Sequence, residues 1–217
     1  FLFSEEKLNI DKYKNVLSEV ESILQENHFK KNVNIDTKEI KEKYLNSIDS
    51  QKMVFDAEDF DNFSKAEDLY KLSQIKFAFE VFEVFKKKSI KFLELQRQAI
   101  KEIDFESQLD TNDFIFKDRE DEKRFKNLEE LSEYHLKEAK SELISIYLKE
   151  KDLKKSKEKL LKRFINREKS LNRISKDDIF SMYVNSFTSF YDPHTNYMTP
   201  KNQEDFEINM YLSLEGI

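Results

Sequence analysis

The sequence predicts an all-α protein, with several long helices in an elongated, bowl-like bundle. Two observations support this fold class. The 217 residues include only one Gly and two Pro, so few positions favour the tight turns that hairpins and sandwiches need. The charges nearly cancel, and 20 Phe and 9 Tyr supply large apolar surfaces, which together argue against a disordered chain.

Composition also excludes several function classes. The sequence has no Cys, which excludes disulfides, thiol catalysis and Cys-ligated zinc. Its net charge of -6 is unfavourable for general nucleic-acid binding, so we expect no nucleic-acid partner. No apolar run approaches the roughly 18 residues of a membrane span. The sequence begins with Phe1 and shows no signal peptide, so we expect both ends to be cut from a longer protein.

Two amphipathic helices are predicted in the first fifty residues. Residues 8–27 carry apolar side chains every three or four positions, which is the spacing of one helix face. These side chains are Ile10, Tyr13, Leu17, Val20 and Leu24. Asp36 and Thr37 form a cap for a second helix. Its inward side chains are Ile40, Tyr44, Leu45 and Ile48. Residues 49–62 are polar and broken, with one short turn expected at 57–60.

A long helix is predicted from Ser64 to about Ile103. It opens with the capping-box pattern Ser64-Lys65-Ala66-Glu67. Residues 77–85 are apolar around much of the circumference, so this segment should be central and covered on more than one side. It would act as a partner groove only if the structure left it uncovered. About forty residues at about 1.5 Å each give a rod near 60 Å, long enough for an arm or brace.

Three further helices are predicted after an irregular stretch at 104–120, in which Asp110-Thr111-Asn112-Asp113 signals a turn. They span about 127–149, a basic segment at 153–174, and 175–190. The last of them opens with a second box-like cap, Ser175-Lys176-Asp177-Asp178.

The C-terminal segment has a different pattern. Pro193 must end the preceding helix. Thr199 and Pro200 read as the cap and first turn of a short helix through Phe206. Apolar residues then alternate from Ile208 to Leu214, which predicts one strand whose ladder partners would lie beyond Ile217. We therefore expect a helical domain at 1–190, a connecting elbow with a short helix at 191–207, and a first strand of a following domain at 208–217.

The sequence contains no complete catalytic constellation. A serine nucleophile elbow and a phosphate-binding loop both need glycines that the chain lacks. His28, His135 and His194 lie in three separate segments. Glu138 follows His135 by one turn, but a single pair of this kind does not build a carboxylate-bridged metal site. We expect no catalytic residue, metal or cofactor here, and a freestanding carboxylate-dependent or metal enzyme is a distant third reading.

Two features have both a structural and a functional reading. His194 lies in a tight loop that could be catalytic, but a turn is the simpler explanation, with Asp192 bonding backbone amides and Pro193 fixing φ. The basic helix is either a solvated face balanced by acidic neighbours or a docking surface for anionic lipid headgroups or an acidic partner. The docking residues would be Lys154, Lys155, Lys157, Lys162, Arg163 and Arg167.

The C-terminal motifs resemble one protease family. Asp192-Pro193-His194-Thr195-Asn196-Tyr197-Met198-Thr199-Pro200 is followed by Met210-Tyr211-Leu212-Ser213-Leu214-Glu215-Gly216-Ile217. This pair of motifs resembles the bacterial tail-specific proteases, also called carboxy-terminal processing peptidases. In that family the first motif ends an N-terminal helical region, and the second opens a PDZ domain. The motif residues carried over are Asp192, Pro193, His194, Thr195, Asn196, Tyr197 and Pro200 for the elbow, and Leu212, Ser213, Leu214, Glu215, Gly216 and Ile217 for the PDZ start.

The resemblance implies a function for the parent protein. The family cleaves proteins from their C-terminal ends in the bacterial periplasm, with a Ser/Lys dyad located after the PDZ domain. This chain would be the non-catalytic N-terminal domain, which shapes substrate access or docks partners. Implied partners are the PDZ and protease domains of the same chain, substrate C-termini, and either a lipoprotein adaptor or a second copy. The alternative is a freestanding helical scaffold or chaperone-like module.

Overall fold

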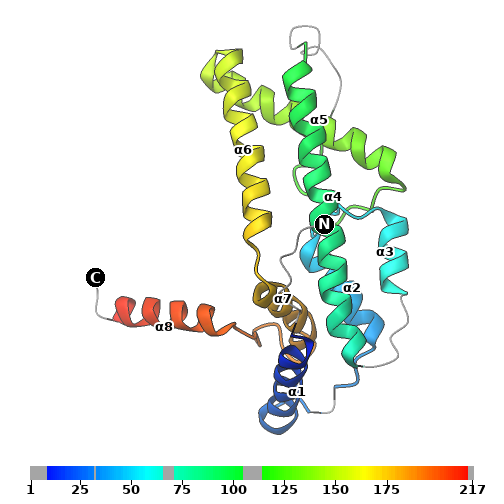
Figure 1. The fold of residues 1–217 in the computed structure, drawn as a ribbon, viewed down its shortest axis with the longest axis vertical. Helices are drawn as coiled ribbons and strands as arrows, with labels where there is room; N and C mark the ends of the chain where they lie inside the picture. The colour runs from blue at the N-terminus through cyan, green and yellow to red at the C-terminus, as the bar shows by residue number, and fades with distance from the viewer. Residues whose placement is uncertain (1–8, 32, 66–70, 105–113, 215–217) are drawn as a thin grey trace. The chain divides into compact units, whose positions relative to one another are not determined.

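The computed structural model describes residues 9–31, 33–65, 71–104 and 114–214 (Figure 1). Within these ranges the chain forms eight helices and no strand, which confirms the all-α prediction. The helices are α1 (Ile10–Asn27), α2 (Thr37–Ile48), α3 (Ala57–Ser64), α4 (Lys71–Glu102), α5 (Leu128–Glu150), α6 (Leu153–Arg173), α7 (Lys176–Thr188) and α8 (Pro200–Leu214). No helix in these ranges is long and apolar enough to cross a membrane.

The chain divides into two compact units. The first unit comprises residues 1–47, 66–80 and 175–217, and the second comprises 48–65 and 81–174. Helix α4 belongs to both, because its first ten residues lie in the first unit and the rest in the second. The helical domain predicted at 1–190 therefore contributes helices to both units.

Aromatic side chains from four helices form the core of the first unit. Tyr13 of α1 packs against Phe180 of α7, with ring centroids 4.8 Å apart. Tyr44 of α2 meets Tyr183 of α7 edge-on at 5.4 Å, and its hydroxyl donates a 2.9 Å hydrogen bond to the Ala78 carbonyl of α4. Burial raises the pKa of Tyr44, which keeps this hydroxyl a donor. Phe77, Ala78 and Phe79 are buried as well, so the part of the apolar middle of α4 that lies in this unit is covered, as predicted.

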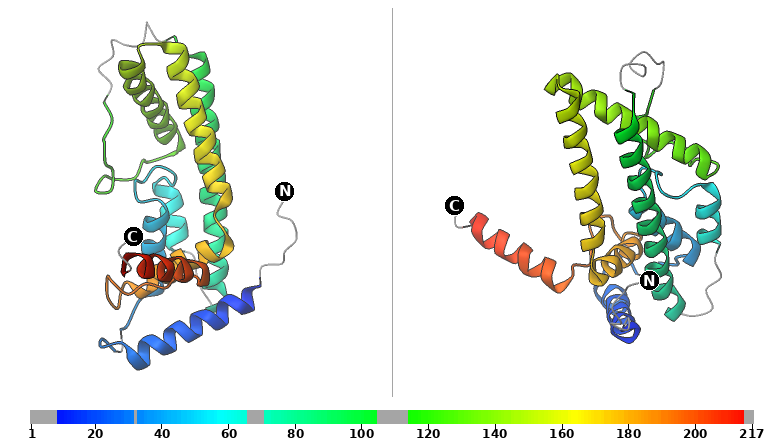
Figure 2. Two further views of the ribbon diagram at one scale, coloured as in Figure 1. Left: turned by 90° about the vertical axis from the view of Figure 1, so that its left-hand side faces the viewer. Right: turned by 45° about the horizontal axis from the view of Figure 1, so that its top comes forward.

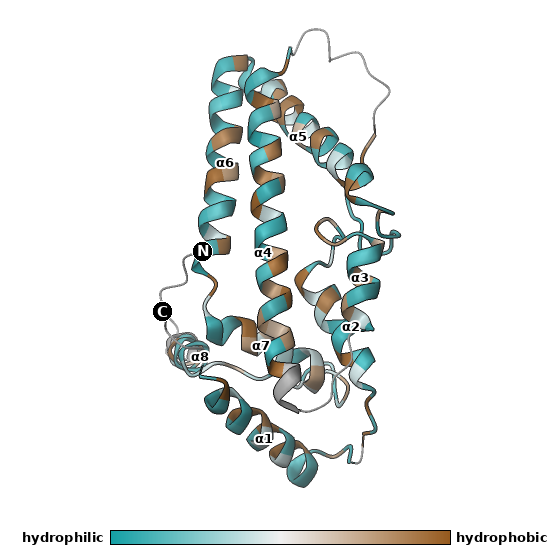
Figure 3. Ribbon diagram, turned by 45° about the vertical axis from the view of Figure 1, so that its right-hand side comes forward, coloured by the Kyte–Doolittle hydropathy of each residue, from teal (hydrophilic) through white to brown (hydrophobic). Residues whose placement is uncertain are grey.

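Helices α4, α5 and α6 pack around one hydrophobic cluster in the second unit (Figure 2). Its members are Leu93 and Ile100 of α4, Ala139, Leu143 and Ile146 of α5, and Leu160 and Phe164 of α6. Figure 3 shows hydrophobic residues, in brown, at intervals along these helices, which is the spacing that turns one side of each helix towards a core. Burying such a stripe stabilises each helix more than its intrinsic propensity does.

A buried carboxylate organises the loop before α3. Asp49 accepts backbone N–H groups from Met53, Val54 and Phe55 at 2.8, 3.2 and 3.0 Å. It also accepts a 2.6 Å bond from Arg124, whose guanidinium donates in turn to the Phe55 carbonyl at 3.1 Å. The polar segment predicted as broken is therefore an ordered loop, because its backbone donors converge on one side chain.

The sequence missed the extent of α3. A short turn was expected at 57–60, but Asp56 and Asp59 form a complete capping box, and the helix that it opens runs from Ala57 to Ser64. The long helix was predicted from Ser64, but Ser64 ends α3, and α4 is described from Lys71 onward. The capping box proposed there reaches into 66–70, and the turn predicted at Asp110–Asp113 falls within 105–113. Both segments lie outside the described residues.

The conformation of the C-terminal segment differs from the prediction. Residues 208–214 were expected to form a strand, but the structure continues α8 through Leu214. The described residues include no strand that could pair with this segment, and a lone strand would leave its backbone groups without partners. A helix satisfies those groups within the segment itself. Glu215, Gly216 and Ile217 lie outside the described residues, and the assignment of 208–217 to a PDZ domain stays a prediction.

Candidate functional site

The loop after α7 is a tight turn built on Asp192. The Asp192 carboxylate accepts the His194 N–H at 2.7 Å, and the Asp192 carbonyl accepts the Thr195 N–H at 3.1 Å. Pro193 and His194 are exposed. Within the described residues the His194 ring makes no hydrogen bond, so its surroundings match a turn position better than a catalytic base, which needs a partner to orient it.

Thr195 ties this loop to two helices of the first unit. Its carbonyl accepts a 2.8 Å hydrogen bond from the Thr188 hydroxyl at the end of α7. Its own hydroxyl lies 3.4 Å from His28 Nε2, just after α1. The Tyr191 ring packs edge-on to the His28 ring at 5.4 Å. His28 and the Asp192 loop therefore meet through Thr195.

Tyr197 is held by a side chain that sequence reasoning missed. Asn185 of α7 accepts the Tyr197 N–H at 2.6 Å and donates to the Tyr197 carbonyl at 3.1 Å, so one amide satisfies both backbone groups. Ser181 donates to the same carbonyl at 3.2 Å, and the Tyr197 ring meets Phe180 edge-on at 5.7 Å. A possible signal was a polar amide inside an apolar helix, since Asn disfavours helix interiors unless its side chain has a partner.

Pro200 begins α8, and Thr199 caps it by accepting the Asn202 N–H at 3.2 Å. Asn196 is exposed. A recess of about 820 Å³ lies between α1, the loop and α8. Its apolar lining includes Val16, Val20 and Ile23 of α1 and Phe206 of α8. The Asp192 loop is thus fixed to α1 and α7 on one side and borders this recess on the other.

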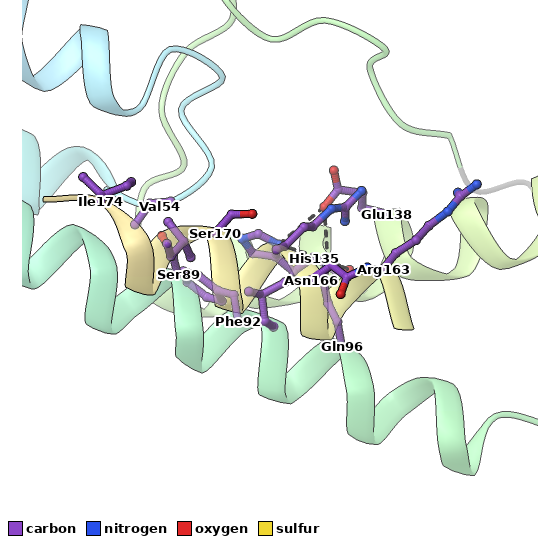
Figure 4. A pocket seen from close by; sticks show the side chains of 13 residues that line it. Val54, Ser89, Phe92, Gln96, His135, Glu138, Arg163, Asn166, Ser170 and Ile174 are labelled. Atoms are coloured by element: carbon purple, nitrogen blue, oxygen red, sulfur yellow. Dashed lines mark hydrogen bonds and ion pairs between the residues drawn. The ribbon is translucent and has the colours of Figure 1, made fainter. Parts of the chain in front are cut away.

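A second pocket, of about 790 Å³, lies between α4, α5 and α6 of the second unit (Figure 4). His135 is buried in its wall, with Nε2 2.7 Å from the Met53 carbonyl, which can only accept. The His135 ring stacks on Phe92 at 4.1 Å. Gln96 donates to the His135 carbonyl and to the Glu138 carboxylate, each at 3.1 Å. This polar cluster forms one end of an otherwise mostly apolar pocket.

The His135 and Glu138 pair is occupied by partners within the protein. Burial alone would raise the pKa of the Glu138 carboxyl, but hydrogen bonding and charge from His135, with Arg167 and Gln96, lower it below its usual value. Among the residues that the structure describes, no three His, Cys, Asp or Glu side chains gather closely enough to hold a metal ion. The Ser89 hydroxyl oxygen, at the other end of the pocket, is buried without a hydrogen-bond partner in the described structure.

The structure sorts the basic side chains predicted on α6 into two groups. Lys157 turns inward and donates to the Ile103 carbonyl at 3.1 Å, just after α4 ends. Arg167 donates two hydrogen bonds, of 2.8 and 3.1 Å, to the Glu142 carboxylate of α5, and Arg163 lies 4.0 Å from the same carboxylate. Lys155 lies 3.6 Å from Asp152. Lys154 and Lys162 are exposed, and no ion pair holds them within the described ranges.

A comparison with known proteins decides the family. The family model described as the tail specific protease N-terminal domain matches residues 20–201. The chain belongs to this family. The tail-specific protease of Haemophilus influenzae is 27% identical over 202 residues, an alignment that covers 89% of this chain and 28% of that protein. The chain therefore spans less than a third of the length of this curated relative.

The tail specific protease N-terminal domain match includes the whole Asp192 loop and ends one residue after Pro200. It also includes α6 and the pocket between α4, α5 and α6. Residues 208–217, which the motif resemblance assigned to a PDZ domain, lie beyond the matched range. Membership in the family therefore rests on the helical body and the loop.

Proposed function

We propose that this chain is the non-catalytic N-terminal domain of a serine endopeptidase that processes proteins from their C-terminal ends. The observation that carries the proposal is the family match over 20–201, which includes the Asp192 loop. Catalysis would reside in a Ser/Lys dyad outside these residues. The helical domain would shape the access of substrates or dock partners.

The Asp192 loop supports a connecting role. Its turn is closed by Asp192, and its exit is held at Tyr197 by Asn185. A connection held at both ends transmits a fixed direction, whereas a Gly- and Ser-rich linker would not. The loop would therefore orient a following PDZ domain relative to the helices of the first unit.

The proposed setting follows from the family. The parent protein would act in the bacterial periplasm, peripheral to the inner membrane. Its helical domain would contact the PDZ and protease domains of the same chain. Substrate C-termini would enter by strand addition in the PDZ domain, and a lipoprotein adaptor or self-association would regulate delivery.

The test is a Pro193→Ala substitution in the full-length parent protein. Freeing φ at this position should alter the cleavage of a reporter with an apolar C-terminal tail, because the direction of the connection is relaxed. Melting of the 217-residue chain with the same substitution should change by no more than about 1 kcal/mol. Equal losses of cleavage and stability would reduce the loop to a purely structural element.

A second experiment checks the size of the parent protein. An antibody against this domain should detect an endogenous protein several times larger than 26.2 kDa in the envelope fraction. A band at 26.2 kDa would favour the freestanding scaffold instead.

A further inference from the structure

The side of α6 that faces solvent carries a continuous basic stripe. Positions 154, 158, 162, 165, 169 and 173 follow one another at spacings of three or four residues, which places them on one helix face. All six residues are exposed. They are Lys154, Glu158, Lys162, Ile165, Lys169 and Arg173. The buried residues of the same helix, Ser156, Leu160 and Phe164, lie on its other side.

The cations of this stripe are not used within the molecule. In the described part of the chain, no ion pair or hydrogen bond engages the side chains of Lys154, Lys162, Lys169 or Arg173. Other basic residues of the helix are engaged, since Arg167 binds Glu142 and Lys157 binds the Ile103 carbonyl. Lys155 and Lys159 are exposed but pair with Asp152 and Glu150. The helix therefore carries cations that bond with neighbouring groups and, on this stripe, four that do not.

The kind of residue left outside points to the partner. Arginine forms bidentate bonds with individual carboxylates. Arg167 binds Glu142 in this way, and Arg163 lies 4.0 Å from the same carboxylate. Three of the four cations on the stripe are lysines, which act as mobile point charges and suit a diffuse anionic surface better than a shaped site. A straight stripe of about 28 Å, estimated at about 1.5 Å per residue, also matches a flat surface.

Ile165 supplies an apolar contact in the middle of the stripe. Its side chain is 42% exposed and lies between Lys162 and Lys169 on the same face. An exposed apolar side chain among lysines can contact the boundary between headgroups and acyl chains, which is the region that the apolar faces of surface helices enter. We propose that the outer face of α6 docks on anionic phospholipid, with the four cations on the headgroups and Ile165 at the interface.

Glu158 provides a strict test of the charge argument, because it is an acidic side chain on the stripe. Each Lys or Arg near an anionic membrane contributes about 1 kcal/mol, or about a fivefold change in partitioning. Removing the opposing charge should act with similar size and opposite sign. Glu158→Gln should therefore strengthen membrane binding about fivefold, a gain that loss of folding cannot imitate.

The measurement is cosedimentation of the 217-residue chain with vesicles of equimolar phosphatidylcholine and phosphatidylglycerol. Binding should occur on these vesicles, weaken with added salt, and be absent on phosphatidylcholine alone. Replacing all four cations (Lys154→Gln, Lys162→Gln, Lys169→Gln and Arg173→Gln) should lower partitioning by roughly two to three orders of magnitude.

The matched control removes four exposed lysines from other surfaces, by Lys14→Gln, Lys87→Gln, Lys91→Gln and Lys117→Gln. It changes net charge by the same amount and should lower partitioning by less than about tenfold, because only Lys87 and Lys91 of this set share a helix face. Equal losses in both sets would overturn the proposal, as would failure of the unsubstituted chain to bind. Retention on a polyglutamate matrix without vesicle binding would also overturn it and would favour an acidic protein partner.

Discussion

At the scale of single residues, the second unit contains a buried ion pair between Asp49 and Arg124. The Asp49 side chain is 2% exposed and that of Arg124 is 8% exposed. Asp49 neutralises Arg124 and also accepts three backbone N–H groups, so one carboxylate satisfies both a buried cation and the loop before α3. Such groups contribute most to stability when one partner is removed, because the other is left buried and uncompensated.

Asp49→Asn should therefore destabilise the chain by about 3–5 kcal/mol, because the buried ion pair with Arg124 is lost and the bonds from three backbone N–H groups are weakened. The effect can be measured as a lower midpoint of urea unfolding. Asp121→Asn is the matched control, because this carboxylate is exposed in the loop before α5. It should change stability by less than about 0.5 kcal/mol. Equal effects of the two substitutions would show that Asp49 contributes only surface charge.

At the scale of elements, the success of prediction depended on whether the signal was local. Helices α1, α2, α5, α6 and α7 lie close to the predicted ranges, because apolar periodicity and caps such as Ser175 with Asp178 are encoded within each segment. The segment 208–214 shows the limit of that rule, since an alternating pattern specifies a strand only when a ladder partner is present.

The candidate site was predictable in part for the same reason. The turn at Asp192 follows from neighbouring residues, and the structure places it as expected. The role of Asn185 was not visible, because its partner Tyr197 lies twelve positions away on a different element. The bonds of Lys157 to the end of α4 and of Arg167 to α5 were also missed, because they depend on where those helices pack.

Asn185→Leu should loosen the loop while α7 persists. The change removes both the acceptor of the Tyr197 N–H and the donor to the Tyr197 carbonyl, so both bonds that hold the loop at this position are lost. Hydrogen exchange at the Tyr197 amide should accelerate, with a global loss of about 1–3 kcal/mol. Asn196→Ala, at an exposed position of the same loop, should leave that amide protected. An unchanged exchange rate of the Tyr197 amide in the Asn185 variant would show that Asn185 does not hold the loop.

At the scale of the whole molecule, α4 is the element that both units share. Its residues up to Glu80 belong to the first unit, and those from Val81 onward belong to the second. Continuous hydrogen bonding along a helix makes its two halves cooperative. Folding of either unit therefore favours the helical state of the segment that the other unit needs.

Interrupting α4 at the unit boundary should uncouple the two units. Glu80→Pro removes a helix hydrogen bond and adds a steric clash, at a cost of about 3 kcal/mol or more. Urea unfolding should then show two transitions in place of one. Glu80→Ala removes the same exposed carboxylate, including its 3.4 Å pair with Lys76, but keeps the helix and should unfold in a single transition. A single transition for both variants would mean that α4 does not transmit cooperativity.

The way Asn185 holds the loop has a consequence for how this connection can diverge. At position 197 the Asn185 side-chain amide bonds to the backbone N–H and carbonyl, which every residue other than proline provides. The path of the connection therefore does not depend on these two bonds having Tyr at that position, although the ring contact with Phe180 does require an aromatic side chain. Mutational drift at 197 can remodel the exposed surface of the loop without redirecting the chain, whereas drift at 185 redirects it at once.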